Sequence, residues 1–194
     1  MAAAARKVQS CFWARPACRS SRRVVQYLRM LNLRLATTGD AQQIADLSRD
    51  LIERGLGWTW HRGRVLRSLR ARETNVLVAT EGSQVIGFAI MEYGDTRAHL
   101  LLLGVRTDYQ RRGIGKRLLA WLEETALVAG ISTIALELRQ SNYGARHFYH
   151  QLGFVEVEYV PGYYRGVETA IRMSRRIGRH AQSNEEREKG RGSH

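Results

Sequence analysis

The stretch HLLLLGVRTDYQRRGIGKRLL, residues 99–119, decides the fold of this chain. Its first part, His99–Val105, is apolar enough to predict a β-strand that is buried on both faces. Its second part, Gln110–Gly115, combines two glycines with two arginines. A helix is then predicted from apolar residues at helical spacing, namely Ile114, Leu118, Leu119, Leu122 and Ala126. A strand, a glycine-rich turn and a helix in this order predict an α/β fold.

The glycine-rich turn also predicts a binding site for an anion. Gly113 and Gly115 remove side chains from the start of the helix, so its free backbone N–H groups can converge on a ligand. Such a helix N-terminus binds phosphate or pyrophosphate, and Arg111 and Arg112 add positive charge. The alternative is a tight strand-to-helix turn with solvated arginines. The pattern matches neither the Walker loop nor the dinucleotide-binding fingerprint.

The rest of the chain alternates between strand and helix patterns. Strands are predicted at Leu31–Ala36, Val76–Thr80, Val85–Tyr93, Thr133–Leu138, Phe154–Val160 and Thr169–Ser174. Helices are predicted at Ala41–Arg54, at Trp60–Arg72, from Ile114 to near Gly130, and from the capping residue Asn142 to Leu152. This order predicts a mixed central β-sheet flanked by helices on both faces.

Composition divides the chain into one domain and two tails. The net charge of +13 includes seven basic and no acidic residues in 1–30, whereas 31–177 holds 20 basic and 15 acidic residues. We therefore expect a domain at 31–177, a basic disordered extension at 1–30 and a charged disordered tail at 178–194. The extension also resembles a mitochondrial transit peptide, or reflects a true start at Met30.

The two cysteines, Cys11 and Cys18, lie in the extension, so neither a disulfide scaffold nor a metal site is expected. No secretory signal is present, which favours a cytoplasmic protein, with a mitochondrial location as the alternative. No apolar run is long enough for a membrane span.

Three motifs together resemble those of one enzyme family. The motifs are VRTDYQRRGIGKRLL at 105–119, LELRQSNYGARHFYHQLGF at 136–154 and GYYRGVETAIRM at 162–173. They resemble the acetyl-CoA motif, the following strand-Asn-helix motif and the closing hairpin of the GNAT N-acetyltransferases, most closely the RimI-like protein N-terminal alanine acetyltransferases. The resemblance spans about residues 31–177 and implies the GNAT fold.

The resemblance implies acetyl-CoA as cosubstrate, with no metal. Its pyrophosphate would be held by backbone N–H groups of the turn, and its pantetheine arm would pair with the strand Leu102–Val105. A strand N–H would then stabilise the charge that develops on the thioester oxygen. Asn142 would contact the cosubstrate, besides capping its helix. The implied binding residues are Leu103, Val105, Gln110, Arg111, Arg112, Gly113, Ile114, Gly115, Lys116 and Asn142.

Two residues are candidates for proton transfer. Glu137 alternates with Ile134, Leu136 and Leu138 along a strand, so it lies on the opposite face, and we expect burial to raise its pKa. It would accept the proton of the amine as general base, directly or through water. Tyr149 would protonate or orient the leaving thiolate. The alternatives are a salt-bridged Glu at a strand edge and a packed aromatic side chain.

Three aromatic residues are candidates for acceptor binding. Tyr163 and Tyr164 lie in the closing hairpin loop, and Trp58 lies with Trp60 between the first two helices. Packing within the hairpin or the core is the alternative for each.

The sequence departs from the RimI-like pattern at His99, where an acid is common, and at Thr169, where E-D-A becomes E-T-A. His147 and His150 are predicted to be surface residues, because a metal site would need a third ligand.

The sequence thus predicts transfer of an acetyl group from acetyl-CoA to a primary amine in a ternary complex. A protein N-terminal α-amine is the preferred acceptor, because its pKa of about 8 makes it easier to deprotonate than lysine at about 10.4. A small-molecule amine is the alternative within the enzyme class. A non-catalytic module that binds CoA or RNA is the alternative outside it, although nucleic acid is not expected as a partner.

Overall fold

The computed structural model describes residues 31–178. Its strands are β1 (Asn32–Leu35), β2 (Thr74–Glu81), β3 (Gln84–Tyr93), β4 (Arg97–Val105), β5 (Thr133–Arg139), β6 (Val155–Tyr164) and β7 (Glu168–Arg176). Its α-helices are α2 (Ala41–Leu51), α3 (Arg62–Arg70), α4 (Ile114–Val128) and α5 (Tyr143–Gln151). Two short 3-10 helices, η1 (Thr38–Asp40) and η2 (Thr107–Tyr109), precede α2 and α4.

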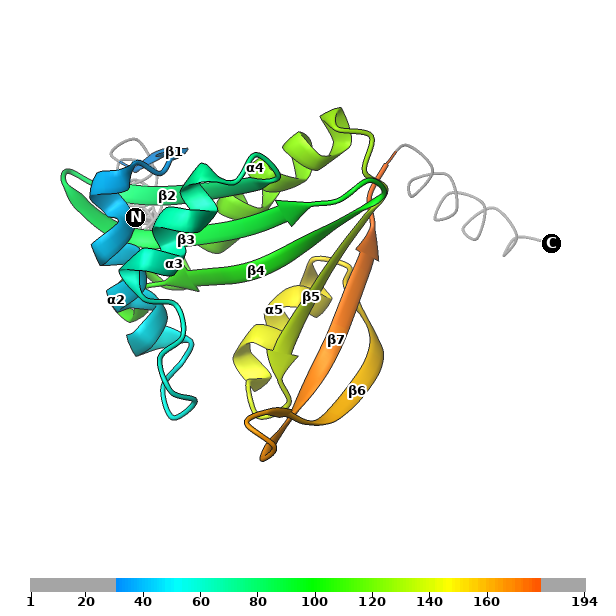
Figure 1. Ribbon diagram of the computed structural model, residues 1–194. Coiled ribbons are helices and arrows are strands. Elements are labelled where there is room, and N and C mark those ends of the chain that lie inside the picture. Colours follow the sequence, from blue (N-terminus) through cyan, green and yellow to red (C-terminus); the bar gives the residue numbers. More distant parts are fainter. Residues whose placement is uncertain (1–30, 179–194) are drawn as a thin grey trace, which may run out of the picture. The chain divides into compact units, whose positions relative to one another are not determined.

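The seven strands form one mixed sheet in the order β1-β2-β3-β4-β5-β7-β6. The pair β4–β5 is parallel, and every other neighbouring pair is antiparallel. β5 pairs with β4 only over Arg97–Leu100, and beyond that point the two strands splay apart (Figure 1). The sheet is therefore forked between β4 and β5, because these two parallel strands share hydrogen bonds over only part of their length.

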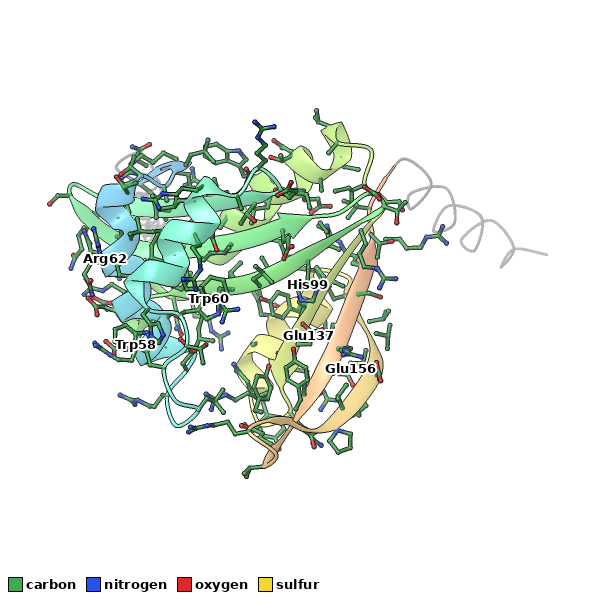
Figure 2. All side chains as sticks on the ribbon, in the orientation of Figure 1. Trp58, Trp60, Arg62, His99, Glu137 and Glu156 are labelled. Carbon is green, nitrogen blue, oxygen red and sulfur yellow. The ribbon has the colours of Figure 1, made fainter. Side chains whose placement is uncertain are left out.

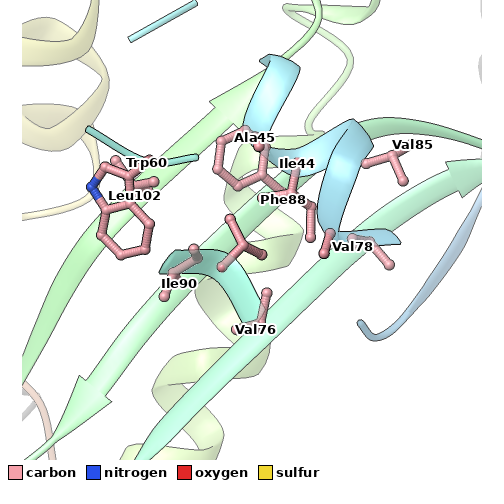
Figure 3. Close-up of a cluster of buried hydrophobic side chains, with 11 residues drawn as sticks. Ile44, Ala45, Trp60, Val76, Val78, Val85, Phe88, Ile90 and Leu102 are labelled. Carbon is pink, nitrogen blue, oxygen red and sulfur yellow. The ribbon is translucent and has the colours of Figure 1, made fainter. Parts of the chain in front are cut away.

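Helices cover both faces of the sheet, as the sequence predicted. On one face, α2 and α3 pack on β2, β3 and β4 around a cluster of buried side chains (Figure 3). This cluster includes Ile44, Ala45, Trp60, Val65, Val76, Val78, Phe88, Ile90 and Leu102. On the other face, α4 buries its apolar stripe, which includes Leu118, Leu119 and Leu122. The alternating register explains how β2 and β3 supply apolar side chains to both layers.

β4 changes the direction of its side chains at a β-bulge. Ile90 of β3 pairs with Leu102 and Met91 pairs with Leu100, so Leu101 has no partner on β3. A bulge bends a strand and strengthens its local twist. It lies one residue beyond the last β4–β5 pair, and thus at the point where the sheet forks.

The predicted element types are correct, but several ends differ. α2 ends at Leu51 instead of Arg54, and α3 spans Arg62–Arg70 instead of Trp60–Arg72. The early end of α2 and the late start of α3 have one cause: Glu53 turns inward and accepts hydrogen bonds from the N–H groups of Thr59 and Trp60, at 2.8 and 3.0 Å. These contacts stabilise a loop at residues that helical periodicity had assigned to the two helices.

The closing hairpin is also longer than predicted. β6 extends to Tyr164 and β7 begins at Glu168, so Tyr163 and Tyr164 lie at the end of a strand and not in the loop. Arg165 and Gly166, both with positive φ, make the turn. The predicted features of residues 1–30 and 179–194 lie outside the described residues. Within 31–178, no helix combines the length and apolar composition needed to cross a bilayer.

Candidate active site

The fork between β4 and β5 opens into a cavity of about 760 Å³. Its walls are β4 from Leu100 to Val105, the start of α4, the end of β5, α5 and the segment that follows α2. Among the predicted site residues, the cavity brings together Glu137, Tyr149, Leu103, Val105, Gln110, Arg111, Gly113, Ile114, Gly115, Lys116, Asn142 and Tyr164. Arg112, Trp58 and Tyr163 do not line it.

The start of α4 forms one end of the cavity. Gly113 has φ +79°, a conformation that glycine adopts without steric cost, and Arg111 also has a positive φ of 60°. The first intrahelical bond of α4 runs from the N–H of Arg117 to the carbonyl of Gly113. The N–H groups of Ile114, Gly115 and Lys116 therefore precede the helical ladder. They are oriented for an anion at the positive end of a 15-residue helix.

Gly115 is required for close packing beside this end of the cavity. A Cβ atom there would lie 3.3 Å from Cζ of Phe148 and 3.5 Å from Cδ2 of Leu103. The absence of a side chain thus lets α4 approach both α5 and β4. The sequence predicted that a glycine is needed at position 115, but it did not predict the contact with Phe148, because α5 begins 28 residues later in the chain.

Two residues of the turn have structural contacts of their own. The side-chain amide of Gln110 donates to the carbonyl of Val105 at 3.0 Å, and its backbone N–H donates to Thr107 at 3.3 Å. Arg112 donates to the carbonyl of Asp108 at 2.8 Å and stacks on the ring of Tyr109. These bonds stabilise the conformation of the turn. The sequence had instead predicted that the backbone N–H of Gln110 binds the pyrophosphate directly.

α5 contributes Asn142 and Tyr149 to the cavity. The carboxamide oxygen of Asn142 accepts from the N–H of Ala145 at 3.1 Å, which confirms the predicted N-cap. Tyr149 is 7% exposed and packs edge-on against Phe148 and Phe154. Burial raises the pKa of Tyr149. Within residues 31–178 no hydrogen-bond partner of its hydroxyl is found, so this buried O–H group can donate to a ligand in the cavity.

Glu137 lies on the opposite face of β5 from Ile134, Leu136 and Leu138, as predicted. Its carboxylate is 2.6 Å from Nε2 of His99 and 3.3 Å from Nε of Arg172. Figure 2 shows His99 and Glu137 next to each other on β4 and β5. The hydrogen bond from His99, with the charge of Arg172, holds the pKa of Glu137 below its usual value. The predicted rise in pKa is therefore wrong, because two donors outweigh the desolvation of a group with 16% side-chain exposure.

The predicted acceptor-binding aromatics differ in position. Tyr164 lines the cavity, and burial raises the pKa of Tyr164 to about 12. Tyr163 is 47% exposed and packs edge-on against Tyr164. Trp58 is 37% exposed, and its Nε1 donates to the carbonyl of Trp60 at 3.1 Å, whereas Trp60 belongs to the buried core. Tyr164 is thus the aromatic side chain of this group that a bound acceptor can reach from the cavity.

Two functional residues, Arg139 and Glu53, were not predicted from the sequence. Arg139, at the end of β5, donates from Nη2 to the carbonyls of Ile52 and Arg54 at 2.7 and 2.8 Å. It ties the segment after α2 to the far side of the fork. Glu53, 7% exposed, holds the α2–α3 loop through the bonds to Thr59 and Trp60. The one sequence signal for these residues is a charged side chain at the end of an apolar strand or helix pattern.

The described part of the chain contains no group of three or more His, Cys, Asp or Glu side chains placed to bind a metal ion. His147 lines the cavity, and His150 is paired with Glu156 at 2.7 Å. The groups available for chemistry in the cavity therefore include backbone amides, the phenols of Tyr149 and Tyr164, and the paired carboxylate of Glu137.

Comparisons with known proteins agree with this arrangement. The model of the acetyltransferase (GNAT) family matches residues 42–154. A [ribosomal protein bS18]-alanine N-acetyltransferase of Haemophilus ducreyi is 36% identical over 105 residues, which cover 54% of this chain and 72% of the relative. The crystal structure of the ribosomal-protein-S18-alanine N-acetyltransferase from Escherichia coli matches with a TM-score of 0.67 and 27% identity, over 77% of this chain and 96% of that one.

A third match extends the comparison of folds. The PaiA N-acetyltransferase of Thermoplasma acidophilum, solved in complex with coenzyme A, has a TM-score of 0.66 at 20% identity. The match covers 76% of this chain and 99% of that one.

A sheet that forks beside a glycine-led helix, with amides at the helix start outside the helical ladder, suits an acyltransferase that uses acetyl-CoA. The family model covers more than half of the chain. This chain therefore belongs to the GNAT family of acetyltransferases, and it is an acetyl-CoA-dependent N-acetyltransferase.

Proposed function

We propose that this enzyme acetylates the α-amine of a protein N-terminus, with an N-terminal alanine as the first candidate. The proposal is supported by the relatives, which are named as alanine N-acetyltransferases of a ribosomal protein. One observation favours it most: Glu137 lines the cavity at the fork, where Tyr164 and the segment after α2 also reach the cavity. A carboxylate there attracts the ammonium group of an acceptor whose chain extends outward between the two walls.

The residues at the α4 end fit coenzyme A. The N–H groups of Ile114, Gly115 and Lys116 suit a pyrophosphate, and the absence of a Cβ at Gly115 keeps the approach open. β4 beyond Leu100 has an edge that β5 does not pair, so its backbone is available to an amide-containing arm near Leu103 and Val105. Acetyl-CoA supplies the activated thioester and leaves as a thiol.

The residues of the chain then act on the amine and on the thiolate. Glu137 attracts the ammonium group of the acceptor beside the cavity and takes part in the removal of its proton. Tyr149 donates a hydrogen bond to the sulfur, which carries negative charge as the bond to carbon breaks. Because burial raises the pKa of Tyr149, its phenol keeps its proton at neutral pH and is always available as a donor.

A protein that modifies ribosomal or other newly made N-termini would work in the cytoplasm. The domain that performs the reaction would be residues 31–177.

The proposal is tested with matched peptide acceptors. The protein is given acetyl-CoA and a peptide that begins with alanine and contains an internal lysine. We expect release of coenzyme A thiol and a mass increase of one acetyl group, located on the α-amine by fragmentation. The same peptide with a blocked α-amine and a free lysine is the control, and we expect it to remain unmodified.

Rapid acetylation of the blocked peptide, or of small amines such as spermidine in place of peptides, would contradict the proposed acceptor. Neither outcome would alter the assignment to the family.

A further inference from the structure

His99 and Glu137 form a hydrogen-bonded pair, and only Glu137 has a role in the reaction described so far. β4 and β5 run parallel here, with His99 opposite Ala135, so Glu137 lies one position further along the same face. Nε2 of His99 lies 2.6 Å from Oε2 of Glu137. The last paired residues of the two strands are Leu100, directly after His99, and Leu136, directly before Glu137. The His99–Glu137 pair therefore lies at the point of the fork (Figure 2).

The hydrogen bond fixes the tautomer of the imidazole. An ionised carboxylate can only accept, so the proton between the two groups belongs to Nε2 of His99. Nδ1 is then the nitrogen that gains and loses a proton. No hydrogen-bond partner of Nδ1 is found within residues 31–178, and the side chain is 35% exposed, so the ring can exchange a proton with water.

Glu137 by itself is a poor base for an ammonium group. Oε1 faces Arg172 and Oε2 accepts from His99, and the pKa of Glu137 is lowered as a result. A base works best when its pKa is near the working pH, which is the range in which imidazoles change charge. The arrangement therefore resembles a carboxylate that orients a histidine more than a carboxylate that acts alone.

The groups around His99 support this arrangement. β3 places Glu92 opposite His99, and β5 supplies Glu137. Arg172 of β7 lies on the far oxygen of Glu137 and is itself paired with Glu158 of β6. The charge in direct contact with the ring is thus the carboxylate of Glu137.

We propose that His99 is the group that holds the proton removed from the acceptor amine, with Glu137 as its orienting carboxylate; this deepens the proposed function and depends on it for the acceptor. An N–H bond of the ammonium breaks and an Nδ1–H bond forms, through one water. The neutral amine forms a bond to the acetyl carbon and the carbon–sulfur bond breaks. The second amine proton passes to the thiolate, and the imidazolium releases its proton to solvent.

The test compares two histidines that each face a glutamate. His99→Gln keeps an N–H donor for Glu137 but cannot take up a proton. His150→Gln alters the other pair, at 2.7 Å from Glu156, and serves as the matched control, because Glu137 lines the cavity and Glu156 does not. Initial rates are measured from pH 5.5 to 9.5 with saturating acetyl-CoA and the alanine peptide, together with coenzyme A binding by calorimetry.

We expect His99→Gln to lower kcat/KM by about 100-fold, the size of a typical general-base contribution, and to remove the protonation step from the acidic side of the profile. The Kd for coenzyme A and the properties of His150→Gln should remain at the values of the unmodified protein. Near-normal rates with an unchanged pH profile in His99→Gln would show that the ring only positions Glu137, and would overturn the proposal.

If the unmodified protein acetylates a different amine instead, the proposed acceptor fails. The same profile measured with that amine still tests His99.

Discussion

The two halves of the active site are built in different ways. In our proposal, the donor half uses the backbone: the unpaired edge of β4 and the first N–H groups of α4, made accessible by Gly113 and Gly115. The acceptor half uses side chains from distant segments, among them Arg139, which joins β5 to the segment after α2. A site built from backbone groups requires particular amino acids at only a few positions, and these lie close together in the chain. A side-chain site needs many contacts across the sequence, and it can change its specificity without loss of the fold.

The largest effect should come from adding a side chain to the donor half. We expect Gly115→Val to weaken coenzyme A binding by at least about 100-fold, because its Cβ would meet Phe148 and Leu103 where the pyrophosphate approaches. Calorimetric titration with coenzyme A measures the change. Gly63→Val is the matched control, because Gly63 is also the second residue of its helix and has open space around it. Equal binding by Gly115→Val and Gly63→Val would show that the backbone at this turn does not hold the ligand.

A second experiment removes the buried carboxylate that orders the α2–α3 loop. Glu53→Gln replaces an acceptor of the Thr59 and Trp60 N–H groups with a partly donating amide. We expect a loss of about 2 kcal/mol in the free energy of unfolding, the cost of unpaired buried donors. The Tm should fall by about 4–8 °C.

Thermal unfolding followed by circular dichroism checks the Glu53→Gln prediction, and the exposed Glu124→Gln on α4 is its control. An unchanged Tm in Glu53→Gln would mean that the loop is held by other contacts.

A third experiment separates the two halves by function. Arg139→Met removes the hydrogen bonds to the carbonyls of Ile52 and Arg54, and we expect the acceptor KM to rise by about 10-fold, equivalent to about 1.4 kcal/mol. The Kd of coenzyme A should stay within twofold. Steady-state kinetics with the alanine peptide provides the first value and calorimetry the second. The exposed Arg176→Met is the control, and a parallel loss of coenzyme A binding would contradict the separation.

The smallest effect should come from a contact outside both halves. Arg34 binds Asp40 through two hydrogen bonds of 2.7 and 2.8 Å and lowers the pKa of Asp40 from its ordinary value to about 2. Because the folded pKa is the lower one, the stabilisation is present above about pH 4 and is lost as the pH falls toward 2.

We expect Asp40→Asn to cost about 1 kcal/mol at pH 7, a value reduced by solvent screening of the partly exposed Arg34, and almost nothing at pH 2. Urea unfolding at both pH values measures the difference. An equal cost at pH 2 would show that the charge of Asp40 is not the cause.

The sequence predicted the geometry of the glycine-rich turn better than the surroundings of Glu137, for a physical reason. The turn Gln110–Lys116 lies between one strand and one helix, so its pattern is local and its backbone geometry follows from two glycines. The bonds of Glu137 depend on strand register: His99 reaches it only through the parallel pairing of β4 and β5. The direction of the pKa shift of Glu137 could therefore not be predicted, because neither neighbour of its carboxylate is local in sequence.

The element ends show the same limit. Helical periodicity correctly predicted that α2 and α3 are helices. It could not predict where α2 ends and α3 begins, because Glu53 sets both ends through hydrogen bonds to the loop between them. The length of β6 was missed because Pro161 and Gly162 are typical of turns, whereas pairing of Tyr164 with Glu168 continues the hairpin past them.

The central claim is that amides at the start of α4 bind the cosubstrate independently of the side chains that act on the amine. Calorimetry with coenzyme A on Glu137→Gln tests it most directly. The account predicts a Kd within twofold of that of the unmodified protein, while acetylation of the alanine peptide falls by about 100-fold. Loss of coenzyme A binding in this variant, or its absence in the unmodified protein, would contradict the account.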